Sequence, residues 1–280
     1  MADSEPISYY LGINVEQDEY HTYLSRKAYL VRLLEKYRMI DAKEISTPME
    51  LKIPVKELNA QKEDPRYPCR NVIGGLMYAR ICTRPNLCYT VCLLARFQSK
   101  SSKLLWTLLK RVLQYVKGTL DLRLTFTSDF AGEPLHTFVK DTCFGKRRLR
   151  RKLLELKGKP VVGFVDSNFA TNDAQAHSTS GMLIKLFGNT IMWSSKRQLN
   201  VALSTMLAQF YALCDITRDI MWLRQHLDTL GLKSLEPTLV FEDNAGCIEI
   251  AKNPSNYKGT RQLETKFFFV RDEINKSIYL

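Results

Sequence analysis

The chain has 280 residues, of which 45% are hydrophobic and 25% are charged, and these ordinary fractions exclude a globally disordered protein. Lysine and arginine number 41 against 29 aspartates and glutamates, which gives a formal net charge of +12. This excess favours a polyanionic partner such as nucleic acid, but a basic globular protein without such a partner fits the composition equally well.

The seven cysteines are odd in number and lack the paired Cys-x-x-Cys spacing of a zinc site, so we expect reduced thiols. The first ten residues contain no basic segment followed by an apolar run, and no apolar stretch approaches the length of a membrane span. We therefore expect a protein of the cytoplasm or the nucleus that is neither secreted nor bound to a membrane.

In chain order, the first expected element is a β-hairpin. Residues 7–15 alternate apolar and polar side chains, and a second short run follows a polar break at 17–19. Ser25 is placed to cap a helix with an apolar stripe from Tyr29 to Tyr37. Residues 55–68 are polar, contain two prolines and predict a loop.

Three helices are expected next, over 69–81, 86–97 and 101–118, with Gly118 just past the end of the third. The periodicity is lost from about 127 to 160. This stretch contains a dense basic run from Lys146 to Lys152, which predicts a solvated linker, a nuclear-import signal or a phosphate-contacting patch. Arg147 and Arg148 are its candidate nucleic-acid contacts.

After residue 160 the pattern is α/β. A strand over 161–165 leads to Asp166, and strands over 182–187 and 190–193 are joined by a turn at Gly188-Asn189. A long amphipathic helix follows and is closed by Gly231. The strand 238–241 leads to Asp243 and Asn244. We expect two further helices, 245–252 and 264–275, and the opening of a last strand at 277–280.

Many short motifs in this order resemble one family, the copia-type retrotransposon Pol polyproteins. They cover nearly the whole chain apart from the stretch 128–160. The segments that carry the resemblance are YLGI at 10–13, LSRKAY at 24–29, STPM at 46–49, IGGLMY at 73–78, TRPNL at 83–87, KRVLQYVKGT at 110–119, STSG at 178–181, WSSKRQ at 193–198, VALST at 201–205, WLR at 222–224, DN at 243–244 and AKNP at 251–254.

The resemblance implies the end of a reverse transcriptase at 1–50, a mainly helical thumb or connection region at 51–127, a basic linker or insertion at 128–159, and a C-terminally truncated ribonuclease H-like domain at 160–280. The expected fold class is α/β, with a mixed sheet and helices on its faces. The polymerase's own catalytic segment lies upstream of this chain in the family.

The family's ribonuclease H domain cuts the RNA strand of an RNA–DNA hybrid with two Mg²⁺ ions held by four carboxylates. By this resemblance Asp166 and Asp243 are the candidate catalytic and metal-binding residues. Gln209 stands where the family has the catalytic Glu, and Leu207 stands at the neighbouring acidic position. Glu264 is a weak further candidate, and the family's fourth Asp lies beyond residue 280.

We weigh three functions. The chain is a degenerate Pol fragment without strong catalysis, a weakly active ribonuclease H, or a nucleic-acid-binding module without chemistry. The candidate nucleic-acid contacts outside the basic run are Lys196, Arg197 and Asn244. Mg²⁺ is the cofactor and an RNA–DNA hybrid is the partner that the resemblance implies, and the oligomeric state is left open.

Overall fold

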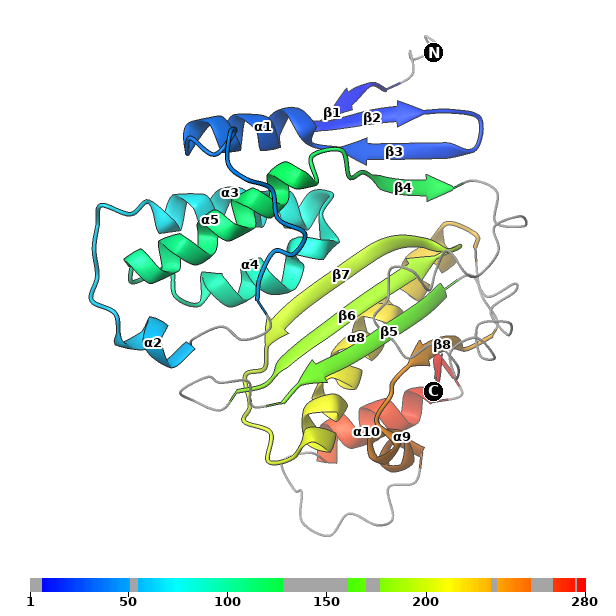
Figure 1. Ribbon diagram of the computed structural model, residues 1–280. Coiled ribbons are helices and arrows are strands. Elements are labelled where there is room, and N and C mark those ends of the chain that lie inside the picture. The colour runs from blue at the N-terminus through cyan, green and yellow to red at the C-terminus, as the bar shows by residue number, and fades with distance from the viewer. Residues whose placement is uncertain are drawn as a thin grey trace. The chain divides into compact units, whose positions relative to one another are not determined.

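The computed structural model describes residues 7–50, 55–127, 161–169, 177–232, 236–252, 264–274 and 276–280. The chain divides into two compact units, with the boundary between Phe126 and Thr127. The described residues of each unit form one sheet, which Figure 1 draws in blue to green for unit 1 and in green to red for unit 2. No helix among the described residues is both long enough and apolar enough to cross a bilayer.

Unit 1 begins with an antiparallel sheet of order β1-β2-β3-β4. Its strands are β1 (Tyr9–Tyr10), β2 (Ile13–Gln17), β3 (His21–Ser25) and β4 (Leu124–Thr127). The predicted hairpin is confirmed as β2 and β3, but the expected single strand over 7–15 is wrong. Leu11 and Gly12 take positive φ angles of 47° and 76° and turn the chain there. The alternation of apolar and polar residues did not predict this tight turn.

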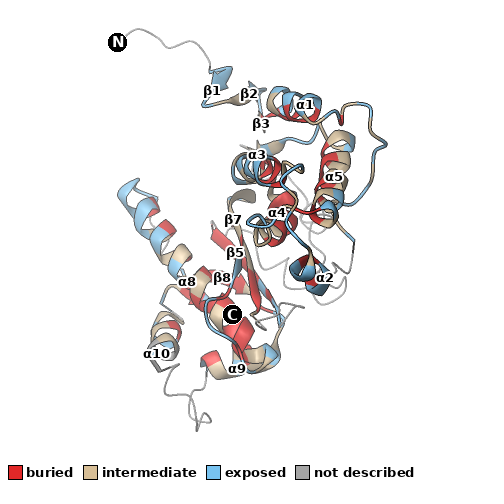
Figure 2. Ribbon diagram, turned by 90° about the vertical axis from the view of Figure 1, so that its left-hand side faces the viewer, coloured by how far each residue is buried: buried red, intermediate tan, exposed pale blue. Residues whose placement is uncertain are grey.

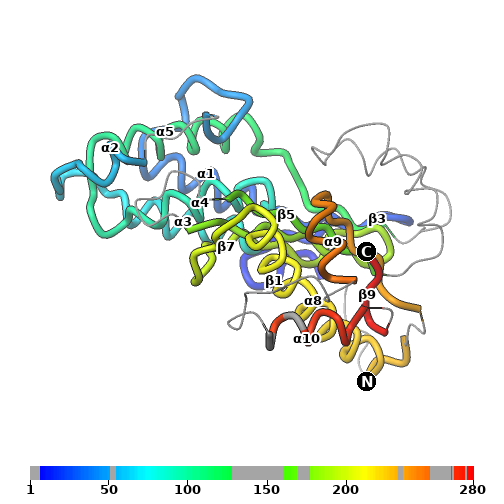
Figure 3. Tube along the Cα trace, turned by 90° about the horizontal axis from the view of Figure 1, so that it is seen from below, coloured from blue at the N-terminus to red at the C-terminus, as the bar shows by residue number. Residues whose placement is uncertain are grey.

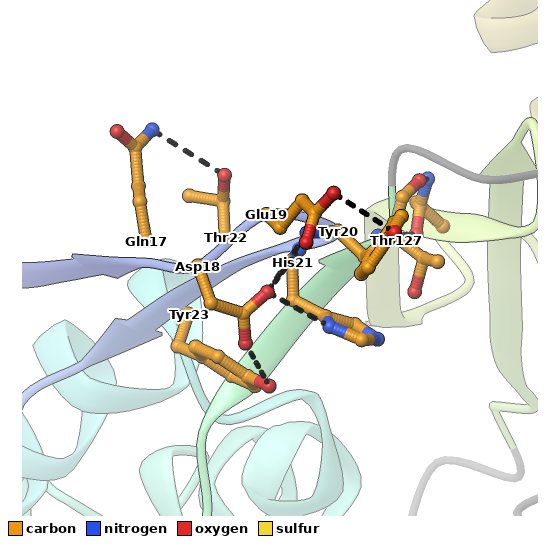
Figure 4. Close-up of polar contacts among 9 residues, drawn as sticks. Gln17, Asp18, Glu19, Tyr20, His21, Thr22, Tyr23 and Thr127 are labelled. Atoms are coloured by element: carbon orange, nitrogen blue, oxygen red, sulfur yellow. Dashed lines mark hydrogen bonds and ion pairs between the residues drawn. The ribbon is translucent and has the colours of Figure 1, made fainter.

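The turn between β2 and β3 is held by one carboxylate, that of Asp18 (Figure 4). Its Oδ1 accepts the backbone N–H groups of Tyr20 at 2.9 Å and His21 at 2.7 Å, and its Oδ2 accepts the Tyr23 hydroxyl at 3.0 Å. These bonds, first of all the one from Tyr20, lower the pKa of Asp18 to about 2. An aspartate at the first position of a turn commonly bonds the backbone in this way.

The helices of unit 1 are α1 (Lys27–Lys36), α2 (Val55–Ala60), α3 (Cys69–Cys82), the short 3-10 turn η1 (Pro85–Leu87), α4 (Cys88–Ala95) and α5 (Lys103–Gly118). Their apolar faces meet in one core, to which residues on both sides of the expected boundary at 50/51 contribute. The three helices expected over 69–118 are confirmed. The predicted loop at 55–68 is wrong in its first part, because Val55 and Leu58 are buried and form one face of α2.

Two expected helix ends in unit 1 differ from the structure. Ser25 is the last residue of β3, and Arg26 is the N-cap of α1 without a side-chain capping bond. Gly118 is the last residue of α5 and Thr119 is the C-cap. A Cβ at Gly118 would lie 3.2 Å from the Cβ of Glu44, so the glycine there allows close packing instead of a left-handed cap.

Unit 2 is built on a five-stranded mixed sheet of order β7-β6-β5-β8-β9. The strands are β5 (Val161–Asn168), β6 (Thr179–Leu186), β7 (Asn189–Arg197), β8 (Thr238–Phe241) and β9 (Ile278–Tyr279). The first three pair antiparallel, whereas β8 pairs parallel with β5, and β9 pairs parallel with β8. The turn between β6 and β7 has positive φ at Phe187 and Gly188, one residue earlier than expected.

Among the described residues of unit 2, three helices pack, namely α8 (Thr205–Thr229), α9 (Ala245–Lys252) and α10 (Glu264–Glu273). The long helix α8 runs along β5 and β6, and α10 lies beside it (Figure 3). Gly163 of β5 allows the close approach, since a Cβ there would lie 3.0 Å from Cδ1 of Ile216 and 3.1 Å from Cδ1 of Ile220. Figure 2 shows buried residues along the turns of α8 that pack on the sheet and mostly exposed ones at its outer end.

The fold class expected from the sequence is confirmed. Unit 2 has a mixed sheet with packed helices, and a mainly helical region precedes it. The expected strands and helices of this unit are present, and the bounds of β8 and α9 agree with the prediction to the residue. The basic stretch 128–159, with Arg147 and Arg148, lies outside the described residues. The expected domain boundaries stay predictions.

Candidate functional site

The candidate site lies where β5, β8 and the start of α8 meet. Asp166 is exposed near the end of β5, opposite Gly181 of β6. The parallel pairing of β5 with β8 places Phe164 opposite Phe241, and the two aromatic rings stack 5.0 Å apart. Asp166 and Asp243 each follow this pair by two residues. The sheet therefore brings these two carboxylates to adjacent strand ends, and Asp243 is also exposed.

Gln209 of α8 contacts Asp166 directly. Its side chain is only 4% exposed, and its Nε2 donates hydrogen bonds to Oδ1 of Asp166 at 2.9 Å and to the carbonyl of Ser167 at 3.5 Å. Its Oε1 is buried and has no hydrogen-bond partner among the described residues. Leu207, which the resemblance places at the neighbouring acidic position, is buried in the main core of unit 2.

Local sequence explains why α8 presents Gln209 at this point. Ser204 is the N-cap, with extended backbone angles, and its side chain accepts the N–H of Leu207 at 3.2 Å. The helix therefore begins at Thr205. Leu207, Ala208 and Phe210 in its first turns are buried, which holds Gln209 in the interior beside β5.

Glu242 is a site residue that the sequence reasoning missed. Its side chain is 9% exposed, its Oε1 accepts the N–H of Asn244 at 3.0 Å, and its Oε2 has no partner among the described residues. Burial, with smaller contributions from the charges of Asp243 and Asp166, raises its pKa to about 7, although the bond from Asn244 acts in the opposite direction. The sequence could have predicted its burial. Glu242 follows the apolar Val240 by two residues, and residues two apart in a strand lie on the same face of the sheet.

The remaining candidates lie near the ends of β7 and β8 or outside the described side chains. Lys196 and Arg197 are exposed at the end of β7, paired with Ser180 and Thr179 of β6. Asn244 caps α9, since its Oδ1 accepts the N–H of Cys247 at 2.9 Å. Glu264 begins α10, but its side chain is not described.

The donor set does not fit a pair of Mg²⁺ ions. No group of three or more His, Cys, Asp or Glu side chains in the described part of the chain is arranged to hold a metal ion. Mg²⁺ requires anionic or carbonyl oxygens in octahedral geometry, whereas the group on Oδ1 of Asp166 is the amide N–H₂ of Gln209. A hydrogen-bond donor thus contacts Asp166 at the position where the resemblance leads us to expect a carboxylate.

The chain is similar to known proteins in sequence, although no family model matches it. The retrovirus-related Pol polyprotein from transposon TNT 1-94 of Nicotiana tabacum is 28% identical over 284 residues, which are 98% of this chain and 19% of that protein. An uncharacterized mitochondrial protein of Arabidopsis thaliana is 30% identical over 222 residues, which are 79% of this chain and 80% of that protein.

A solved ribonuclease H1 isolated from compost covers 41% of this chain and 75% of its own, with a TM-score of 0.30 and 20% identity. The likeness is slight. The chain spans about a fifth of the length of the first Pol polyprotein it matches (19%). Its match to such proteins over almost its whole length shows that the chain belongs to the family of retrovirus-related, copia-type Pol polyproteins.

Proposed function

We propose that unit 2 is a ribonuclease H-like domain that binds nucleic acid, with RNA–DNA hybrids as its ligand class, and does not cut it. The observation that carries this proposal is the 2.9 Å hydrogen bond from Nε2 of Gln209 to Oδ1 of Asp166. A neutral amide that donates to Asp166 adds no negative charge to the site and occupies the oxygen that a metal ion would need.

Binding is supported by charge. Lys196 and Arg197 project exposed at the end of β7, and the chain carries a net charge of +12. Asp166 of β5 pairs with Gly181 of β6, and Gly181 pairs with Ser195 of β7. Lys196 and Arg197 follow Ser195, so both cations lie at the same end of the sheet as Asp166. Cations at that end of the sheet attract phosphates and release their condensed counterions.

A weakly active nuclease is the second candidate, and one observation favours it. Asp166 and Asp243 each follow the paired residues Phe164 and Phe241 of two adjacent parallel strands by two positions, and two carboxylates at neighbouring strand ends can share an ion. The first proposal explains the site better, because the buried Gln209 amide contacts one of these two carboxylates.

The test is a cleavage assay on a labelled RNA–DNA hybrid in Mg²⁺ or Mn²⁺, with binding measured in parallel. We expect the unmodified protein to bind the hybrid without cutting it. We expect Gln209→Glu to recover little cleavage, because the described residues contain no group of three or more His, Cys, Asp or Glu side chains arranged to hold a metal ion. Gln209→Met is the matched control, since it removes the amide without adding charge. Metal-dependent cleavage by the unmodified chain, abolished by Asp243→Asn, would overturn the proposal.

A further inference from the structure

His177 lies two residues before β6, at the end of the sheet where Lys196 and Arg197 are exposed. We propose that its imidazole is a third cationic contact for the phosphates of a bound RNA–DNA hybrid and that it acts only when protonated, so that binding strengthens as the pH falls. This inference rests on the proposed nucleic-acid binding of unit 2 and names a residue that regulates it.

One hydrogen bond determines which ring nitrogen of His177 is available. Its Nδ1 lies 2.8 Å from the backbone carbonyl oxygen of Gln198. A carbonyl oxygen only accepts hydrogen bonds, so Nδ1 carries a hydrogen in the neutral ring as well as in the cation. The lone pair of the neutral ring is therefore on Nε2, which has no hydrogen-bond partner among the described residues. A proton taken up at Nε2 turns an acceptor, which makes no hydrogen bond to a phosphate oxygen, into a charged donor.

Gln198 holds this ring in place because three hydrogen bonds fix Gln198 itself. Its backbone N–H donates to the carbonyl of Ser178 at 2.9 Å. Its buried side chain donates from Nε2 to Oγ of Ser180 at 2.9 Å and to the carbonyl of Ala208 at 2.8 Å. Ala208 belongs to the first turn of α8. The imidazole is thus bonded to the junction of β6, β7 and α8, which also carries the candidate site.

Among the described residues, the strand pairs next to His177 bring cations to it. Thr179, two residues further along the chain, pairs with Arg197 of β7 and with the uncharged Asn168 of β5. The next residue of β6 pairs with Lys196. A positive charge on His177 is unfavourable beside these cations until a phosphate lies between them, so protonation and phosphate binding favour each other.

The acids of the candidate site are further away. The β6 residue that pairs with Asp166 is four residues after His177, which is about 13 Å along the strand. Glu242 and Asp243 follow β8, on the far side of β5. Helix α8 has no charged side chain before Asp215. Salt screens exposed charges over about 10 Å, so these acids do not cancel the positive charge that His177 adds.

The test measures the affinity of the full-length protein for a labelled RNA–DNA hybrid at pH 5.5 and pH 8, over a range of salt concentrations. At the lower pH we expect about fivefold higher affinity and a slope of log affinity against log salt that is steeper by about one, because one more cation contacts a phosphate. His177→Asn should lose the change of slope, since its amide can still donate to Gln198 but takes up no proton. His177→Arg should have the steeper slope at both pH values.

His226→Asn is the matched control. Nδ1 of His226 also bonds a backbone carbonyl, that of Trp222 at 2.9 Å, but His226 is exposed in the last turn of α8, so this variant should keep the full change of slope. Glu242, with a pKa of about 7, titrates in every variant, so a difference between variants belongs to the replaced histidine. Circular dichroism checks that each variant is folded at both pH values.

The outcomes separate this inference from the proposed function. A folded His177→Asn variant with the same change of slope as the unmodified protein would overturn the role of His177 alone, and so would an equal loss in His226→Asn. A protein that binds no hybrid at either pH would overturn the proposed function and this inference together.

Discussion

At the scale of single residues, Glu242 is an acid whose ionisation the fold of unit 2 opposes. It is buried beside Asp243 and Asp166, and its pKa rises from the ordinary 4.5 to about 7. Between these two values the folded protein holds a proton that the unfolded chain has lost. The free energy of unfolding should therefore fall as the pH rises from about 4.5 to 7.

We expect Glu242→Gln to remove this fall and to stabilise the protein above pH 7, by on the order of 2 kcal/mol. Urea unfolding at pH 5 and at pH 8 measures the effect, with Glu249→Gln as the control because Glu249 is an exposed acid on α9. Equal pH dependence in the unmodified protein and in Glu242→Gln would show that Glu242 ionises normally in the folded state.

At the scale of helices, one serine begins the principal helix of each unit. Ser102 accepts the N–H of Leu105 at the start of α5, and Ser204 accepts that of Leu207 at the start of α8, both at 3.2 Å. Both have extended backbone angles, as N-cap residues do. Helices of this length gain most of their stability from packing, but the cap determines where they begin.

Ser204→Ala should destabilise unit 2 by about 1 kcal/mol, because an N–H at the start of α8 loses its acceptor. Ser204→Asp should be nearly neutral, since aspartate also caps and favours the positive end of the helix dipole. Chemical unfolding and hydrogen exchange of the first α8 amides measure both changes. An aspartate variant as unstable as the alanine variant would mean that the serine acts through something other than capping.

At the scale of the whole molecule, the net charge of +12 makes any nucleic-acid binding depend on salt. The affinity for an RNA–DNA hybrid should fall steeply with ionic strength, since each phosphate contact releases counterions. Lys196→Gln with Arg197→Gln should lower the slope of log affinity against log salt by about two, if both residues contact phosphates.

The control for this measurement removes two positive charges elsewhere. Lys56→Gln with Lys62→Gln changes exposed lysines of unit 1 and lowers the net charge by a similar amount. An equal loss of slope in this control would assign the salt dependence to overall charge and not to the end of β7.

The sequence by itself determined much of unit 2 and the family. A short apolar run predicted β8 to the residue and a short helical segment predicted α9 to the residue, because such patterns report burial along one short segment. The motifs implied the Pol family, and the comparisons showed it. The motif resemblance also led us to expect Gln209 at the position of the family's catalytic Glu.

Only the tertiary structure decided what these residues touch. The alternating pattern of residues 7–15 does not predict the turn at Leu11-Gly12. Helix α2 forms because Val55 and Leu58 are buried against the core of unit 1. The contact between Gln209 and Asp166 joins residues 43 positions apart, and the high pKa of Glu242 comes from burial and from neighbouring charges. Contacts and solvent exclusion of this kind depend on how distant segments pack, and local patterns do not encode that packing.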